Sequence, residues 1–153
     1  MSNSLIVKNT ITIDAPAAKV WDALVNPEQT KQYMFGCEAI SDWKPGSSLI
    51  WKGVFDGKEL IAVKGEIVEI KPGQYLEYTC IDPNSSIPDL PENYLTVTYD
   101  LKEQNGQTTL TVTQGDYATV ADGQQRYDHT MQEGGWDSIL VQIKKLVESE
   151  AGS

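Results

Sequence analysis

The sequence predicts an α+β domain in which a curved antiparallel sheet wraps around a long C-terminal helix. The first observation is a series of short alternating segments separated by tight turn signals, which is typical of an antiparallel meander. The second is residues 128–150, where apolar side chains recur mostly at three- and four-residue steps: Met131, Trp136, Ile139, Leu140, Ile143 and Val147. A sheet must cover its apolar face, and no other predicted helix is long enough to do so.

The predicted C-terminal helix contains Gly134 and Gly135 in its interior. An interior glycine destabilises a helix by about 1 kcal/mol relative to alanine, so a pair of them needs a structural reason. Bare backbone lets another surface approach closely, or leaves open space beside the helix. We expect the rest of the chain to form the sheet that grips this helix.

The first third of the chain predicts one strand followed by two short helices. Residues 5–13 alternate between apolar and polar side chains, which indicates a half-buried strand. Pro16 is well placed for the first turn of a helix. Asn26 is suited to be the N-cap of a second short helix that begins at Pro27.

The middle of the chain predicts the rest of the sheet. The expected strands cover residues 38–41, 48–54, 60–70, 75–81, 94–102 and 108–114. Asp56-Gly57 and Asn105-Gly106 supply the positive backbone angles that tight hairpin turns need. Gly65 predicts an irregularity inside the longest strand. Residues 82–93 contain three prolines and predict a long loop, and such loops often shape an entrance or a binding edge.

The chain has 153 residues, which suits one domain, residues 1–153, with a core of about 5–149. Hydrophobic residues make up 40% of the chain and charged residues 22%, so it is predicted to be globular rather than disordered. The formal net charge is −10. This charge opposes binding to nucleic acid or to anionic membrane surfaces, because both need basic patches.

The sequence predicts no membrane insertion and a cytoplasmic location. No apolar run approaches the roughly 20 residues of a spanning helix, and residues 1–10 lack a signal-peptide pattern. Cys37 and Cys80 are predicted to be free thiols, as is usual in a reducing compartment. Together with the single histidine, His129, they do not match the spacing of a zinc site. The sequence therefore predicts neither a metal nor a cofactor.

Several segments of the chain resemble those of a known protein superfamily. Residues 15–24 and 26–28 resemble its opening, and residues 65–73 resemble its central strand and turn. Residues 108–114 resemble its last strand, and Gly135-Trp136 with the following Leu140 resembles its last helix. Together these segments are similar to those of START-like helix-grip proteins, the SRPBCC superfamily. The branch that this chain resembles contains bacterial relatives of the C-terminal domain of the cochaperone that activates the Hsp90 ATPase.

The resemblance implies a seven-stranded antiparallel sheet wrapped around the long helix, with a cavity between the two. The two short helices then lie between strands 1 and 2. Members of the wider superfamily bind lipids, sterols, hormones and polyketides, and some are cyclases or hydrolases. Ser47 departs from the pattern, since many relatives have a glycine at this position.

Aromatic side chains are the leading candidates for the walls of such a cavity. Large rings supply apolar area, and their hydroxyl or N–H groups fix the orientation of a ligand. The candidate ligand-binding residues are Trp43, Trp51, Tyr78, Tyr99, Gln114, His129 and Trp136. The alternative is that the rings simply fill the core.

Gln114 is a polar candidate on an apolar strand face. It shares that face with Leu110 and Val112, which should meet the helix. A buried amide needs hydrogen-bond partners, so Gln114 indicates a polar spot in an apolar pocket. A bond to neighbouring backbone at the strand end is an equally good explanation.

The sequence assigns no catalytic residue. His129 could act as a general base with Asp116 or Asp128, or activate Cys80 as a nucleophile. A lone histidine is more often an exposed or satisfied residue. The signatures of familiar serine hydrolases, nucleotide-binding proteins and zinc peptidases are missing.

Three functional hypotheses follow. The first is a non-enzymatic binding protein that holds a small apolar or amphipathic molecule between sheet and helix. The second is a cyclase- or hydrolase-like enzyme that uses the same cavity. The third is a stress-related, cochaperone-like module with a chaperone partner, although the basic surface that would meet an acidic partner is sparse. The sequence also leaves open whether the protein forms a homodimer.

Overall fold

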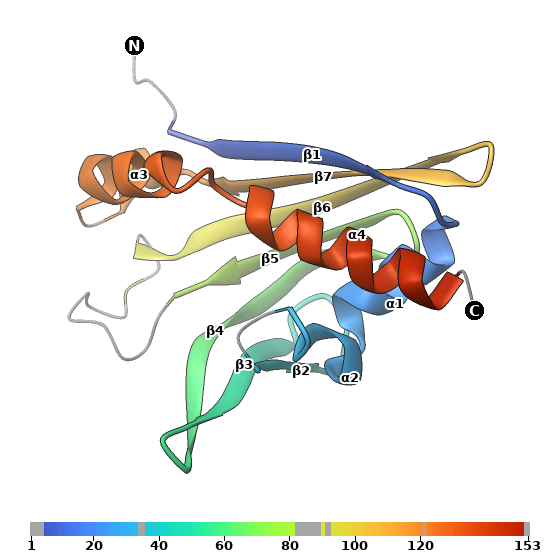
Figure 1. Ribbon diagram of the computed structural model, residues 1–153. Helices are drawn as coiled ribbons and strands as arrows, with labels where there is room; N and C mark the ends of the chain where they lie inside the picture. The colour runs from blue at the N-terminus through green and yellow to red at the C-terminus, as the bar shows by residue number, and fades with distance from the viewer. Residues whose placement is uncertain (1–4, 34–35, 82–89, 91–92, 121, 152–153) are drawn as a thin grey trace.

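The computed structural model describes residues 5–33, 36–81, 90, 93–120 and 122–151. They form a seven-stranded antiparallel sheet in the order β1-β7-β6-β5-β4-β3-β2. The strands are β1 (Val7–Ile13), β2 (Glu38–Ser41), β3 (Ser48–Phe55), β4 (Lys58–Lys71), β5 (Tyr75–Cys80), β6 (Leu95–Gln104) and β7 (Gln107–Gly115). Helix α4 (Asp137–Ala151) crosses one face of this curved sheet (Figure 1). The predicted α+β helix-grip fold is confirmed.

The two short helices lie between β1 and β2, as predicted. Helix α1 (Ala17–Val25) follows Pro16, and α2 (Pro27–Thr30) follows directly. The side chain of Asn26 accepts a hydrogen bond of 3.0 Å from the backbone N–H of Glu28. Asn26 is therefore the N-cap of α2, because its side chain satisfies an amide that the helix leaves without a partner.

The predicted hairpin turns are present. Asp56 and Gly57 have φ angles of +51° and +76°, and Asn105 and Gly106 have +55° and +80°. Two-residue turns of this hand match the twist of the flanking strands. Residues 82–93, predicted as a loop at an entrance, lie mostly outside the described part of the chain.

Two register shifts bend the long strand β4. The pairing with β3 skips Ala62, and the pairing with β5 skips Val68. The predicted irregularity therefore occurs on both sides of Gly65 rather than at it. Gly65 has a different role, because a Cβ atom there would lie 1.7 Å from the backbone oxygen of Thr79. Only a residue without a side chain allows that approach of the two strands.

The C-terminal helix is divided, which corrects the prediction of one helix over residues 128–150. A break at Gly134 and Gly135, with φ angles of +87° and +62°, separates α3 (Gly123–Gln132) from α4. Left-handed backbone cannot continue a right-handed helix, and glycine adopts it without a steric penalty. Figure 1 shows α3 beyond the N-terminal end of α4.

The break also changes which residues form the apolar stripe. Leu140, Ile143 and Val147 on α4, and Trp136 just before it, are buried, as expected for the face that meets the sheet. Met131, predicted to belong to the same stripe, is 50% exposed. It lies on α3, on the other side of the break, so its position in the sequence pattern no longer sets its direction.

The core fills the space between the sheet and helices α1 and α4. Its largest fully buried side chains include Tyr99, Ile13, Leu24, Leu49 and Ile67. Cys37 and Cys80 are free thiols, as predicted. No helix in the described part of the chain is long and apolar enough to cross a membrane.

Candidate ligand-binding site

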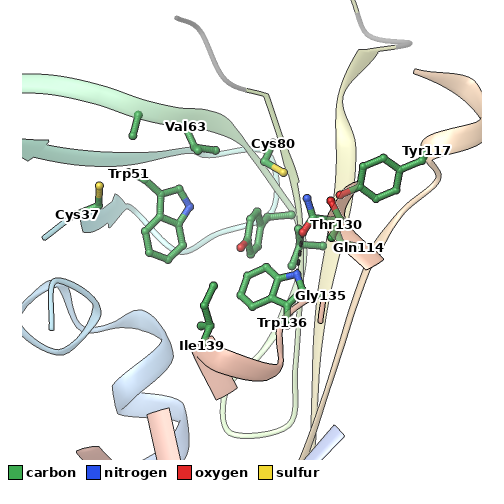
Figure 2. A pocket seen from close by; sticks show the side chains of 13 residues that line it. Cys37, Trp51, Val63, Cys80, Gln114, Tyr117, Thr130, Gly135, Trp136 and Ile139 are labelled. Carbon is green, nitrogen blue, oxygen red and sulfur yellow. Dashed lines mark hydrogen bonds between the residues drawn. The ribbon is translucent and has the colours of Figure 1, made fainter. Parts of the chain in front are cut away.

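A partly open cavity of about 320 Å³ lies between the sheet and the break before α4. The five strands β3 to β7, three helices and the break itself supply most of its walls. The lining residues are Cys37, Trp51, Ala62, Val63, Tyr78, Cys80, Val97, Gln114, Tyr117, Thr130, Gly135, Trp136 and Ile139. Figure 2 shows the Trp51 and Trp136 rings facing the same space, with Ile139 beside them. The cavity is large enough for a small organic molecule.

Four aromatic rings form a chain of contacts at this cavity, three of which line it while Tyr99 packs behind them. The centroids of Trp51 and Tyr78 are 6.4 Å apart, those of Tyr78 and Tyr99 are 5.7 Å apart, and those of Tyr99 and Trp136 are 5.9 Å apart. The last two pairs meet edge to face, which is a favourable arrangement of ring quadrupoles. The hydroxyls of Tyr78 and Tyr99 share a hydrogen bond of 2.9 Å. These contacts fix the rings before any ligand arrives.

Gln114 is the polar group of the apolar wall. The indole Nε1–H of Trp136 donates a hydrogen bond of 2.7 Å to its Oε1 atom. The face that Gln114 shares with Leu110 and Val112 is the buried one, as predicted from the alternation of β7. The half-buried amide oxygen of Gln114 therefore has a hydrogen-bond partner that also lines the cavity. This bond joins β7 to the break before α4.

The register shift in β4 shapes the opposite wall. Neighbouring residues of a regular strand point to opposite faces. The extra residue Ala62 interrupts this alternation, so Ala62 and Val63 both line the cavity. Val63 is paired with Trp51 on β3, which places the indole next to the bulge.

The cavity wall contains no charged side chain among the described residues. Burial raises the pKa of the Cys80 thiol to about 12 and holds the pKa of the Tyr78 hydroxyl well above its ordinary value. Burial also raises the pKa values of Cys37 and Tyr117. These groups stay neutral near pH 7, so the wall favours binding of apolar groups over proton transfer.

A second, more polar pocket of about 430 Å³ adjoins this apolar cavity. The two share Gln114, Tyr117 and Thr130. The other residues that line the polar pocket are Leu95, Asp122, Gln125, Arg126 and His129. Tyr117 begins the short helix η2 (Tyr117–Thr119), and it stands at the end of the apolar cavity beyond Gln114 (Figure 2).

The structure brings together four of the seven candidate residues. Trp51, Tyr78, Gln114 and Trp136 line the apolar cavity, and the buried ring of Tyr99 packs behind them. Trp43 and His129 do not line it.

Trp43 lies half-buried in the turn after β2, where its φ angle is +55°. His129 is on the exposed side of α3, where its Nε2 atom is 3.3 Å from the Glu133 carboxylate. It lines the polar pocket only.

The residues proposed for acid–base chemistry have other contacts. Oδ1 of Asp116 accepts hydrogen bonds of 2.8 Å from the backbone N–H groups of Leu5 and Ala118. This carboxylate caps η2 and ties the start of β1 to the end of β7. Cys80 lines the apolar cavity, whereas His129 lines the polar pocket. No cluster of three or more metal-ligating side chains occurs in the described residues.

Several lining residues were not predicted. Ala62 and Val63 face the cavity together because of the bulge, and no residue type in β4 indicates where that bulge lies. Ile139 was predicted as part of the helix stripe rather than of a cavity wall. Cys37, just before β2, has a small apolar side chain that gave no functional signal.

A sheet that grips a C-terminal helix, with a cavity between them, defines a START-like helix-grip protein of the SRPBCC superfamily. Residues 14–148 match the family described as "Activator of Hsp90 ATPase homolog 1-like protein". The chain belongs to this family.

Solved structures agree with this assignment. The chain is 37% identical to protein ChR145 from Cytophaga hutchinsonii, with a TM-score of 0.75 over 100% of both chains. Protein NE0264 from Nitrosomonas europaea is 18% identical, with a TM-score of 0.72 over 100% of both chains. Protein CV1439 from Chromobacterium violaceum is 19% identical, with a TM-score of 0.70 over 94% of this chain and 96% of that one. No curated protein shows a significant match to the sequence.

Proposed function

We propose that this protein binds a small apolar or amphipathic molecule in the cavity between the sheet and the C-terminal helix. The observation that supports the proposal is the wall itself. Trp51, Tyr78 and Trp136 present rings to a space of about 320 Å³ that no charged side chain of the described residues lines. Such walls gain free energy by covering apolar ligand surface, and Gln114 adds a polar group that can orient it.

The first experiment is native mass spectrometry of the freshly purified protein, compared with its denatured mass. A reproducible extra mass that is lost on denaturation would reveal a bound small molecule, and its fragmentation would give the chemical class. The native mass also distinguishes a monomer from a homodimer, a question that the sequence leaves open. A protein expressed in the cytoplasm is the right starting material, because that is the location we propose.

The second experiment fills the cavity. Ile139 on α4 is half-buried and lines the space, so Ile139→Trp should place a larger side chain in it. Ser138→Trp is the matched control, because Ser138 is exposed on the same turn of α4. Binding of an amphipathic fluorescent probe such as 1-anilinonaphthalene-8-sulfonate, whose rings would enter the cavity, should fall in the Ile139 variant only. Equal probe binding in both folded variants would contradict the proposed site.

A chaperone partner is the second candidate, because the family is named after an activator of the Hsp90 ATPase. That function would use the outer surface rather than the cavity. Stimulation of a bacterial Hsp90 ATPase by this protein, equally strong in the Ile139→Trp variant, would support it. The cyclase- or hydrolase-like alternative lacks a comparable observation, since the described cavity wall offers no carboxylate or histidine.

A further inference from the structure

The apolar cavity continues into a pocket of different chemistry. Gln114, Tyr117 and Thr130 line both spaces, so a molecule that extends past them leaves apolar walls and meets polar and charged groups. The polar pocket, of about 430 Å³, has room for a head group. A ligand that fills both spaces must therefore be amphipathic.

Arg126 is the one arginine or lysine among the described residues that line the polar pocket, and it lies beside the apolar cavity. Its guanidinium carbon lies 5.9 Å from the centroid of the Tyr117 ring, which lines both spaces. Burial raises the pKa values of Tyr117 and Cys80, and the positive charge of Arg126 opposes the rise at both groups. Because Tyr117 lines both spaces, the guanidinium group of Arg126 lies close to their junction.

The other ionisable side chains in and beside the polar pocket are weaker candidates for ligand contact. His129 lines the pocket and is 71% exposed, and its Nε2 atom is 3.3 Å from the carboxylate of Glu133, which is 68% exposed and does not line the pocket. Asp122 also lines the pocket and is exposed. Solvent screens exposed charges, whereas Arg126 is half-buried. Among the described residues that line the polar pocket, Arg126 is therefore the cationic side chain that solvent screens least.

We propose that the ligand is an organic carboxylate whose ring or chain occupies the apolar cavity and whose carboxylate binds Arg126 in the polar pocket. The inference rests on the proposed function and gives its ligand a chemical class. A guanidinium group matches a carboxylate with two parallel hydrogen bonds, which fixes orientation as well as affinity. Gln114 and Tyr117 offer further hydrogen-bonding groups at the junction of the two spaces.

The test uses two probes of the same shape and different charge, 3-(2-naphthyl)propanoic acid and 3-(2-naphthyl)propan-1-ol. Isothermal titration calorimetry should show that the wild-type protein binds the acid about tenfold more tightly than the alcohol. Arg126→Gln should weaken binding of the acid by about tenfold and leave that of the alcohol within roughly twofold. Arg126→Lys, which keeps the charge without the planar fork, should retain part of the affinity for the acid.

Lys102→Gln is the matched control, because Lys102 is an exposed residue on β6 that lines neither pocket, and the net charge changes equally. It should leave the affinity for both probes unchanged. An equal loss of acid affinity in the Lys102 and Arg126 variants would overturn the inference, because net charge alone would explain it. A wild-type protein that binds the alcohol as tightly as the acid would overturn it and leave the proposed function standing. Binding of neither probe would contradict the proposed function itself.

Discussion

The side-chain oxygen of Asn9 accepts a hydrogen bond of 3.0 Å from the backbone N–H of Trp136, a residue 127 positions later in the chain. The side-chain N–H₂ group of Asn9 donates a second bond, of 3.2 Å, to the carbonyl of Gly134. One asparagine on β1 thus holds both ends of the break between α3 and α4. Since Trp136 lines the cavity and bonds to Gln114, Asn9 positions a wall that it does not itself form.

Asn9→Ala should destabilise the protein by about 1–3 kcal/mol, because two hydrogen bonds are lost and the break is no longer held. Urea unfolding measures the change. Thr10→Ala is a suitable control, since it removes only one exposed hydroxyl contact, to Thr111. The tryptophan emission of the Asn9 variant should also shift, because the indole of Trp136 gains freedom. A control variant that is destabilised as much as the Asn9 variant would contradict this role for Asn9.

Alanine substitution should have different effects at Gly134 and Gly135, the two glycines of the break. Both have positive φ, so alanine at either position costs about 1–2 kcal/mol in backbone strain. At Gly135 a Cβ atom would also lie 2.5 Å from Oδ1 of Asn9 and 2.8 Å from Cγ1 of Val7. At Gly134 the nearest atom, in Asp137, is 3.8 Å away.

Gly135→Ala should therefore lower the free energy of unfolding by more than Gly134→Ala, which is its natural control. Thermal unfolding of both variants under the same conditions measures the difference. If the two variants lost equal stability, β1 would not pack closely against the break.

The sequence predicts most of this fold because its strand signals are local. The alternation of residues 5–13 and the Asp56-Gly57 and Asn105-Gly106 turns each specify their own segment without help from the rest of the chain. The break before α4 is different. The steps from Trp136 to Leu140, Ile143 and Val147 are helical, but the sequence pattern does not locate the change of direction that positive φ at the two preceding glycines imposes.

The site is less predictable than the fold, because it depends on contacts between distant segments. The alternation of β7 alone predicts the face on which Gln114 lies. The hydrogen bond of Gln114 to Trp136, however, also requires the break before α4 and the contact of that break with β1. Ala62 lines the cavity only because β4 contains a bulge. Trp43 and His129 have suitable chemistry, yet their segments direct them away from the apolar cavity.

Gln114→Leu should destabilise the protein by about 1–2 kcal/mol, because the indole N–H of Trp136 is left without its acceptor. Gln114→Glu keeps an acceptor at this position, but places a carboxylate beside apolar walls. Its stability should therefore recover as the pH falls and the new carboxylate is protonated. Chemical unfolding of both variants at two pH values makes the comparison. Stability of the leucine variant equal to that of the wild type would show that the bond contributes nothing.

The two thiols should react slowly in the native protein. Burial raises the pKa of Cys80 to about 12 and raises that of Cys37, so the reactive thiolate is scarce at neutral pH. Labelling with 5,5′-dithiobis(2-nitrobenzoic acid) at about pH 7.5 should be much slower than for free cysteine and should become fast in urea. Cys37→Ala isolates Cys80. Rapid labelling of Cys80 in that folded variant would instead favour the nucleophile hypothesis.

Glu148 on α4 links the C-terminal helix to β1 and predicts a dependence of stability on pH. Its carboxylate accepts a bond from the ammonium group of Lys144 and another, of 2.8 Å, from the backbone N–H of Asp14. Lys144 first, and then the Asp14 amide, hold the pKa of Glu148 below its ordinary value. A carboxyl whose pKa is lower in the folded than in the unfolded protein stabilises the fold above the unfolded pKa, and this contribution is lost as the pH falls through the folded pKa.

Glu148→Gln should therefore reduce the free energy of unfolding at about pH 7, and the difference from wild type should shrink toward about pH 3. The exposed Glu66, on β4, provides the control variant Glu66→Gln, whose difference from wild type should be small at both pH values. Urea unfolding across this range measures both. A Glu148 variant whose deficit stays constant with pH would mean that the loss is one of packing or helix propensity. In that case the bonds to Lys144 and Asp14 would not be what ties α4 to the start of the sheet.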